Sequence, residues 1–152
     1  MTVPDSVIKN CWDQMVSDGT NNVVFHDELC NSDLFLQFIK SSAILPQFIL
    51  YNQTIAGFTW LSEIGKNSAV GNFCFFKPFW GYGIPEELGQ MVLDYWFSFP
   101  GKDKPLFDII IGKTPEWNRK AVSYIKKLDF TILGTIPYLS RGRGMVISYK
   151  TR

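Results

Sequence analysis

The chain has 152 residues, the length of one ordinary domain, so we expect a single domain over residues 1–152. Apolar residues make up 46% of the chain and charged residues 19%, a balance that excludes an intrinsically disordered protein. The formal net charge is +1, and basic residues gather only near Arg141 and Arg143, which excludes the broad basic surface of most nucleic-acid-binding proteins.

The sequence also lacks the patterns typical of membrane, secreted and metal-binding proteins. No apolar run approaches the roughly 20 residues of a membrane-spanning helix. The first residues lack the basic and apolar regions of a secretory signal, so we expect none. Cys11, Cys30 and Cys74 lie far apart and the chain has one histidine, which predicts no metal site. Free thiols in a cytoplasmic protein are the plain interpretation of this cysteine pattern.

The N-terminal part of the chain is predicted to be helical. Apolar residues recur at helical spacing over residues 7–16, which indicates a first helix. A second apolar stripe over residues 34–39 follows Asn31 or Ser32, either of which can cap a second helix. Between the two stripes, residues 23–25 form a short apolar piece that is available to fill an edge of a sheet.

From residue 46 onward the apolar pattern becomes that of strands. We expect strands over residues 47–51, 54–64 and 69–76. Residues 52–53 and 65–67 carry the turn signals that join them. Three antiparallel strands in sequence form a meander.

Helices and strands alternate in the second half. A helix is predicted over residues 85–97, followed by a continuous apolar run over residues 106–111 that is typical of a central strand covered on both faces. Thr114 can cap another helix, and strands are expected over residues 132–139 and 144–150.

This order of elements predicts the α/β class, with an α+β mixed sheet and helices on both faces. A helix lies between the meander and the central strand, so this connection is a β-α-β crossover. The two strands that the crossover joins should therefore be parallel, inside an otherwise antiparallel sheet.

Two glycines flank Tyr82 between a predicted strand and a predicted helix. Glycines let the N–H groups of a loop turn inward, and a helix N-terminus adds unpaired donors and the positive end of its dipole. Such a loop suits a pyrophosphate group. An ordinary tight turn fits the same residues.

Asn118 opens the later helix, whose apolar stripe includes Ala121, Ile125 and Leu128. One interpretation is an amphipathic helix with an early polar residue. The other is that Asn118 faces a ligand lodged beside the central strand.

Together, the two motifs resemble those of the GNAT superfamily of acyl-CoA-dependent N-acetyltransferases. The family loop Gln/Arg-x-x-Gly-x-Gly/Ala corresponds to residues 78–83, and its segment Asn-x-x-Ala/Ser…Lys-Leu-Gly-Phe corresponds to residues 118–130. The resemblance covers roughly residues 32–150. It implies transfer of an acetyl group from acetyl-CoA, with no metal, to an amine of an unidentified protein or small molecule.

The resemblance also implies a cofactor site. The amides around the two glycines would hold the pyrophosphate of CoA, the end of the preceding strand would offer backbone groups to the pantetheine arm, and the asparagine would face the ligand. Strands 72–76 and 106–111 would diverge at the ligand end. The site residues are then Phe75, Phe76, Trp80, Gly81, Tyr82, Gly83, Ile84 and Asn118.

In this family, the resemblance implies, a neutral amine attacks the thioester, a base removes the ammonium proton and an acid protonates the thiolate. Glu63, on or just past the second strand, is our leading candidate base. The family's acidic tyrosine falls on Ile125, and Tyr124, expected about 100° away round the helix, is the candidate acid in its place. His26 is interpreted as a structural or surface residue.

Departures from the family pattern keep a second hypothesis open. Pro78 replaces the usual Gln/Arg, Ile125 replaces the tyrosine, and Asp129 replaces a glycine, which is tolerable in a left-handed backbone conformation. The alternative is a GNAT-fold protein with weak or no catalysis. It would bind a protein partner or a second copy of itself, or serve in virion assembly in a host cell, since bacteriophages also encode small divergent proteins of this kind.

Overall fold

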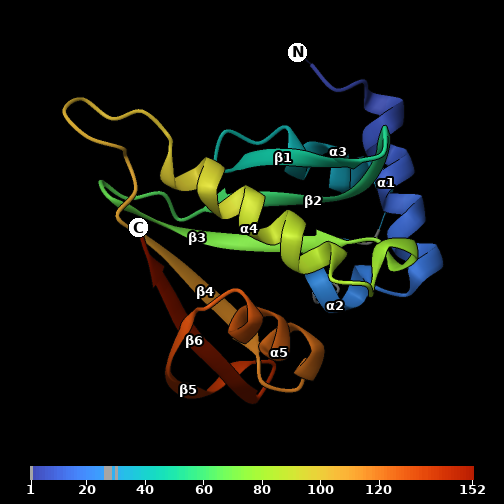
Figure 1. The fold of residues 1–152 in the computed structure, drawn as a ribbon. Helices are drawn as coiled ribbons and strands as arrows, with labels where there is room; N and C mark the ends of the chain where they lie inside the picture. Colours follow the sequence, from blue (N-terminus) through green and yellow to red (C-terminus); the bar gives the residue numbers. More distant parts are fainter. Residues whose placement is uncertain (1, 26–28, 30) are drawn as a thin grey trace.

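A computed structural model describes residues 2–25, 29 and 31–152, and its centre is a mixed sheet of six strands in the order β1-β2-β3-β4-β6-β5 (Figure 1). The strands are β1 (Leu45–Tyr51), β2 (Thr54–Ser62), β3 (Ser68–Phe75), β4 (Ile109–Pro115), β5 (Thr131–Ser140) and β6 (Arg143–Thr151). The helices are α1 (Asp5–Asp18), α2 (Asn21–Phe25), α3 (Ser32–Ile39), α4 (Ile84–Phe97) and α5 (Arg119–Lys127), with a 3-10 turn, η1 (Lys77–Phe79). The predicted α/β mixed sheet is confirmed.

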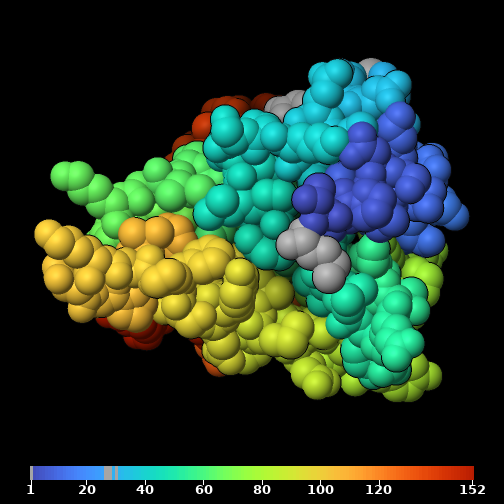
Figure 2. All heavy atoms as spheres, turned by 90° about the horizontal axis from the view of Figure 1, so that it is seen from above, coloured from blue at the N-terminus to red at the C-terminus, as the bar shows by residue number. Residues whose placement is uncertain are grey.

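Helices cover both faces of the sheet, as predicted. Seen from above, the blue N-terminal helices and the yellow α4 lie on opposite sides of the teal strands (Figure 2). One buried cluster joins α1, α2 and α3 to β2 and β3 through Ile8, Trp12, Phe25, Phe35, Phe58 and Cys74. The other joins α4 and α5 to the sheet through Leu61, Ala69, Leu93, Trp96, Ile110 and Ile125.

β3 and β4 are the parallel pair, which confirms the predicted crossover. Their ladder is short, because only Ser68–Val70 pair with Ile109–Ile111. Beyond these residues β3 pairs only with β2, and β4 pairs only with β6. The two strands therefore separate at the end that leads to α4 and α5, as the family resemblance implied.

The central strand begins later than predicted. The apolar run begins at Leu106, but β4 runs Ile109–Pro115. The N–H of Leu106 donates to the carbonyl of Phe99 at 2.7 Å, and Phe107 is fully buried beside Phe99. These apolar residues thus fill the core from the loop after α4, and an apolar run alone does not distinguish such a loop from a strand.

Two other predictions were wrong. Thr114 does not cap a helix, because the β4–β6 ladder extends to the Pro115–Met145 pair and keeps the backbone extended there. Residues 23–25 belong to α2 and fill no sheet edge. The predicted cap Asn31 is confirmed, since its side chain accepts hydrogen bonds from the first turn of α3.

The described cysteines are free thiols, and the described residues contain no cluster that could bind a metal. Cys11 and Cys74 are free and buried, and burial raises the pKa of the Cys11 thiol to about 11. Outside residues 1, 26–28 and 30, no group of three or more potential metal ligands occurs. The described helices include none with the length and apolar character to cross a membrane. His26 and Cys30 lie outside the described residues.

Candidate functional site

A cavity of about 240 Å³ lies where β3 and β4 separate. Val23 and Val24 of α2 line it from one face of the sheet, and Ala121 and Tyr124 of α5 line it from the other. The cavity therefore joins the two faces through the gap between the strands. A ligand held there reaches both helical layers.

Each of the two strands has a glycine directly after its last residue in the β3–β4 ladder. A Cβ atom on Gly71 would lie 2.7 Å from the Trp96 ring and 2.8 Å from Ile110, so these buried side chains fill the space that a larger residue would need. A Cβ atom on Gly112 would lie 2.4 Å from Oγ of Ser148. Glycine in a strand often marks such a close approach, and here it marks the start of the gap.

The backbone of β3 offers hydrogen-bonding groups to the gap. The N–H of Phe76 donates to the carbonyl of Ala56 at 2.8 Å, so Phe76 faces β2. Because backbone groups alternate in direction along a strand, those of Phe75 and Phe73 face the opposite side, toward the gap. Of the two residues expected to serve a pantetheine arm, Phe75 is so placed and Phe76 is not. Sequence reasoning missed Phe73, because only the strand pairing shows which residues alternate toward the gap.

Trp80 closes the end of β3. Its indole Nε1–H donates to the Phe75 carbonyl at 2.8 Å, and Nζ of Lys120 lies 4.9 Å from the centre of its ring. The indole therefore links β3 to α5 and occupies one of the carbonyls that face the gap. A ligand amide that uses this carbonyl has to displace the indole.

The loop before α4 has the features expected of an anion site. Gly81, Tyr82 and Gly83 have φ values of 96°, 53° and 74°, and within residues 77–87 their N–H groups donate to no backbone carbonyl. No side chain caps α4 at Gly83, and a Cβ atom on either glycine would meet nothing within 4 Å. The N–H of Ile84 is used inside the loop, at 3.1 Å from the Gly81 carbonyl.

Acidic and basic residues meet beside this loop. Glu86, in the first turn of α4, accepts a hydrogen bond from Lys127 at 2.9 Å, and this contact lowers the pKa of the carboxyl. The first turn of α4 carries two carboxylates, Glu86 and Glu87, and Lys127 offsets the charge of Glu86.

Two departures from the family pattern have local compensations. Pro78 lies in the first turn of η1, where its missing N–H costs no hydrogen bond. The neighbouring Lys77 N–H donates to Asp18 at 2.8 Å, which fixes the loop to α1. Asp129 has a φ of 61°, the left-handed conformation expected for it.

Asn118 caps α5 and also lies at the cavity. Its Oδ1 accepts a hydrogen bond from the Ala121 N–H at 3.2 Å, which makes it the N-cap of α5. It also lines the cavity. The cap uses the side-chain oxygen and leaves the amide NH₂ outside this bond.

Tyr124 and Ile125 both line the cavity, although they are adjacent on α5. The Tyr124 ring packs edge-on against Phe73 and Phe75, and its hydroxyl donates to the Pro85 carbonyl at 2.6 Å. Burial, and then the charge of Glu86, raises the pKa of this hydroxyl far above its ordinary value. Tyr124 therefore keeps its proton and acts as a hydrogen-bond donor.

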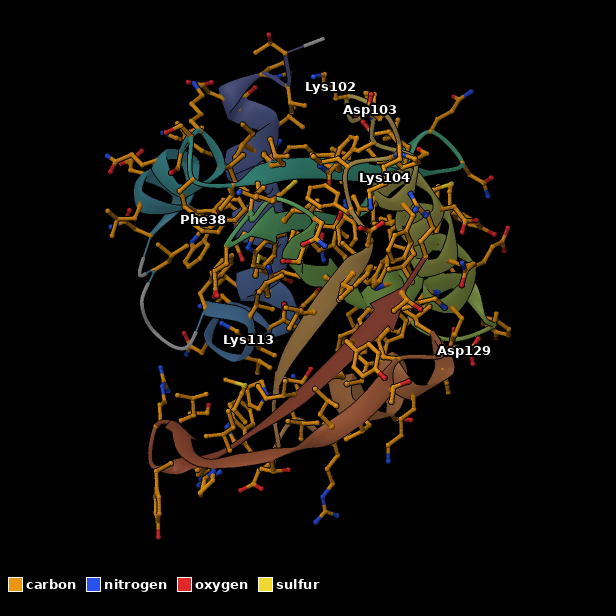
Figure 3. The ribbon with its side chains drawn as sticks, turned by 90° about the vertical axis from the view of Figure 1, so that its left-hand side faces the viewer. Phe38, Lys102, Asp103, Lys104, Lys113 and Asp129 are labelled. Atoms are coloured by element: carbon orange, nitrogen blue, oxygen red, sulfur yellow. The ribbon has the colours of Figure 1, made fainter. Side chains whose placement is uncertain are left out.

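Glu63 lies on the other face of the sheet, together with a residue that sequence reasoning missed. Nζ of Lys113 donates to both carboxylate oxygens of Glu63 at 2.6 Å. Lys113 lines the cavity from β4 and lies beside α2 (Figure 3). The signal in the sequence was a lysine at the end of an otherwise apolar strand.

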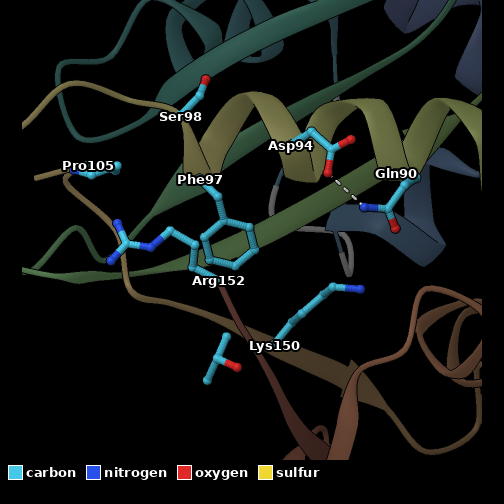
Figure 4. Close-up of a pocket in the computed structure, with 8 residues that line it drawn as sticks. Gln90, Asp94, Phe97, Ser98, Pro105, Lys150 and Arg152 are labelled. Atoms are coloured by element: carbon cyan, nitrogen blue, oxygen red, sulfur yellow. Dashed lines mark hydrogen bonds between the residues drawn. The ribbon is translucent and has the colours of Figure 1, made fainter.

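A second hollow, of about 470 Å³, lies between the C-terminal half of α4 and the end of β6 (Figure 4). Its cations have partners within the fold, because Lys150 donates to the Leu128 carbonyl at 2.6 Å and Arg152 pairs with Asp108 at 3.1 Å. It lies at the opposite end of α4 from the glycine loop. The gap between β3 and β4 is therefore the stronger candidate site.

Neither a protein-family model nor a curated protein sequence matches this chain. Among solved structures, it is similar to the microcin self-immunity acetyltransferase MccE in complex with acetyl-CoA and AMP, at 18% identity and TM-score 0.70 over 95% of this chain and 88% of that one. It is also similar to the ribosomal alpha-N-protein acetyltransferase RimL in complex with coenzyme A, at 10% identity and TM-score 0.80 over 98% and 90%. A variant of spermidine N-acetyltransferase SpeG from Vibrio cholerae matches at 18% identity and TM-score 0.67 over 93% and 90%. The chain has the fold of the GNAT acetyltransferases.

Proposed function

Given this acetyltransferase fold, we propose that the protein transfers an acetyl group from acetyl-CoA to an amine. The observation that carries the proposal is the cavity between β3 and β4, together with the loop after β3, where the N–H groups of residues 81–83 donate to no backbone carbonyl of residues 77–87. The similar structures of MccE and RimL hold acetyl-CoA and coenzyme A, which supports the same cofactor here.

The cofactor would lie along the gap on the α4 and α5 side. The N–H groups of residues 81–83 would bind the pyrophosphate, because unpaired amides at a helix N-terminus favour anions. The backbone groups of Phe73 and Phe75 would pair with the pantetheine arm, with the indole of Trp80 displaced from the Phe75 carbonyl. Asn118 would contact the arm from the start of α5.

The acceptor amine would approach from the α2 side of the gap. An ammonium group with a pKa near that of lysine, ≈ 10.4, must lose a proton before it can attack, and Glu63, paired with the cavity-lining Lys113, is the candidate base. The nitrogen then bonds to the thioester carbon, and N–H groups of β3 stabilise the oxygen as its negative charge develops. The C–S bond breaks, and its electron pair leaves with the sulfur.

Tyr124 would assist the departing thiolate without protonating it. A free thiol has a pKa of about 8.5, whereas burial holds the pKa of Tyr124 well above the ordinary tyrosine value. Proton transfer from Tyr124 to the thiolate is therefore uphill. Once released from the Pro85 carbonyl, the hydroxyl can donate a hydrogen bond to the sulfur, and solvent supplies the proton.

We expect Glu63→Gln to lower kcat/KM at pH 7 by ~10²-fold or more, the usual scale for loss of a general base. Glutamine keeps the shape of the side chain and can still accept from Lys113, but it cannot take a proton. The matched control is Asp33→Asn, which alters another exposed ion pair, Lys9–Asp33, at 2.6 Å between α1 and α3. The control should keep the parent rate, and an unchanged rate in Glu63→Gln would show that the proton leaves by another route.

We expect two variants of Asn118 to separate its cap from its contact with the ligand. Serine also caps helices well, so Asn118→Ser should keep the melting temperature and lose CoA affinity with the amide NH₂. Asn118→Ala should lose CoA affinity and also ~1 kcal/mol of stability. Thermal unfolding and calorimetric titration with CoA measure the two effects. Parent affinity in Asn118→Ser would make the residue a cap only.

The proposed function is tested by calorimetric titration with CoA and acetyl-CoA, followed by acetyl transfer to a panel of amines. Binding with turnover supports an acetyltransferase. Binding with no turnover of any amine would favour a GNAT-fold binding protein instead. No heat with either ligand at millimolar concentration would contradict the cofactor site.

A further inference from the structure

The α2 side of the cavity carries an ion pair next to apolar walls. Lys113 lines this side together with Val23, Val24 and Trp60. Its Nζ lies 2.6 Å from both carboxylate oxygens of Glu63. Lys113 thus holds a carboxylate, Glu63, one hydrogen bond from the lining of the cavity on the α2 side.

The strand register assigns this ion pair to the acceptor side of the gap. Side chains alternate along a strand, so Lys113 shares a face with Ile111, and Ile111 pairs with Val70. By the same alternation Val70 shares a face with Asn72, which pairs with Trp60. Trp60 is buried among the N-terminal helices, so Lys113 lies on their side of the sheet. The glycine loop and α5 serve the other face. The acceptor therefore reaches the gap past Lys113 and Glu63.

The contact between Lys113 and Glu63 can be replaced by contacts with a ligand at a small cost in free energy. The side chains of Lys113 and Glu63 are 37% and 61% exposed. Exposed ion pairs contribute little to stability, because water solvates both partners well. A ligand that offers Lys113 another carboxylate can therefore release Glu63.

We propose that the acceptor is a zwitterion, a primary amine with a carboxylate one or two carbons away, as in a free amino acid. The inference rests on the proposed acetyltransferase function. The carboxylate of the acceptor replaces Glu63 on Nζ of Lys113, and its ammonium faces the released Glu63. The side chain of the acceptor packs on Val23, Val24 and Trp60.

This exchange also frees the base. While both oxygens of Glu63 accept from Lys113, the carboxylate is poorly placed to take a proton. An amine without a carboxylate leaves that contact intact, and a polyamine also meets the positive charge of Lys113. A zwitterion occupies Lys113 itself, so binding of the correct acceptor and release of the base are one event.

The transfer step then balances. The ammonium gives one proton to Glu63, and its nitrogen forms the C–N bond as the C–S bond breaks with its electron pair on sulfur. The second nitrogen proton reaches the thiolate through solvent. The products are an N-acetylated amino acid and CoA, with one proton left on Glu63.

The test measures CoA release by the full chain with glycine, leucine and phenylalanine, with the amide of each, and with spermidine. We expect at least one amino acid to exceed its own amide by about 10-fold or more in kcat/KM, the scale of a hydrogen bond to a charged group. Lys113→Met should bring amino acid and amide to the same level. A purely structural role of Lys113 would lower both equally and keep the ratio. Lys9→Met, from the Lys9–Asp33 pair, is the control and should leave the ratio unchanged.

Each contrary outcome identifies what fails. Equal or better turnover of the amides or of spermidine by the parent protein would overturn the zwitterion, and so would a preference that survives in Lys113→Met. If CoA binds in calorimetry and no amino acid is acetylated, the zwitterion is overturned while the cofactor site stands. If CoA does not bind, the proposed function and this inference fall together.

Discussion

Gly83→Val is expected to weaken CoA binding by ~100-fold or more while the protein stays folded. Gly83 has a φ of 74°, a conformation that valine strongly disfavours, so the loop and its amides should shift. The added side chain would also occupy open space beside the amides, since a Cβ atom there meets nothing within 4 Å. Loss of two charge-assisted hydrogen bonds to phosphate accounts for an effect of this size.

Gly142→Val is the matched control. Gly142 has a φ of 72° and equally open surroundings, but it lies in the turn between β5 and β6. Both variants carry a backbone strain of roughly 1–3 kcal/mol, so their melting temperatures should fall alike. Only Gly83→Val should lose CoA. Equal CoA affinity in Gly83→Val and the parent would make the loop an ordinary turn.

Ile110→Ala is expected to reduce the free energy of unfolding by ~2–5 kcal/mol. Ile110 is fully buried in β4, pairs with Ala69 at the start of the gap and touches the space above Gly71. Its truncation leaves a cavity that neighbouring Trp96 cannot fill without moving. At roughly 2–4 °C for each kcal/mol in a chain of this size, the melting temperature should fall by roughly 4–20 °C.

Leu133→Ala provides the comparison for this loss of stability. Leu133 lies on β5 and is 68% exposed, so its truncation should change the free energy of unfolding by no more than ~0.5 kcal/mol. Urea unfolding of the two variants gives both values. A loss below ~1 kcal/mol in Ile110→Ala would contradict the central position of β4. Saturating CoA should raise the melting temperature of Ile110→Ala, because a ligand that binds only the folded state stabilises it.

Local sequence signals predicted the fold well where a short segment decides the structure. Strong turn residues between alternating apolar stretches predicted the meander. The glycines at 81 and 83, between a strand and a helix, predicted the loop and the crossover. The apolar stripe after Asn118 predicted the helix α5, but its cap was also sought at Thr114, which belongs to β4.

Features that depend on contacts between residues far apart in the sequence could not be predicted from such local patterns. The start of β4 is set by pairing with Ser68–Val70 and with β6, which the apolar run from Leu106 does not reveal. The Glu63–Lys113 pair joins residues 50 positions apart, and it requires the register of three strands. The direction of Phe73 and Phe75 toward the gap depends on the same register.

The most direct test of the cofactor site is a titration with CoA followed through backbone amide chemical shifts. We expect shifts at Gly81, Tyr82 and Gly83, and at Phe73 and Phe75 in the gap, with Gly142 in the β5–β6 turn unchanged. Unchanged signals of Gly81 and Gly83 at millimolar CoA would contradict this site.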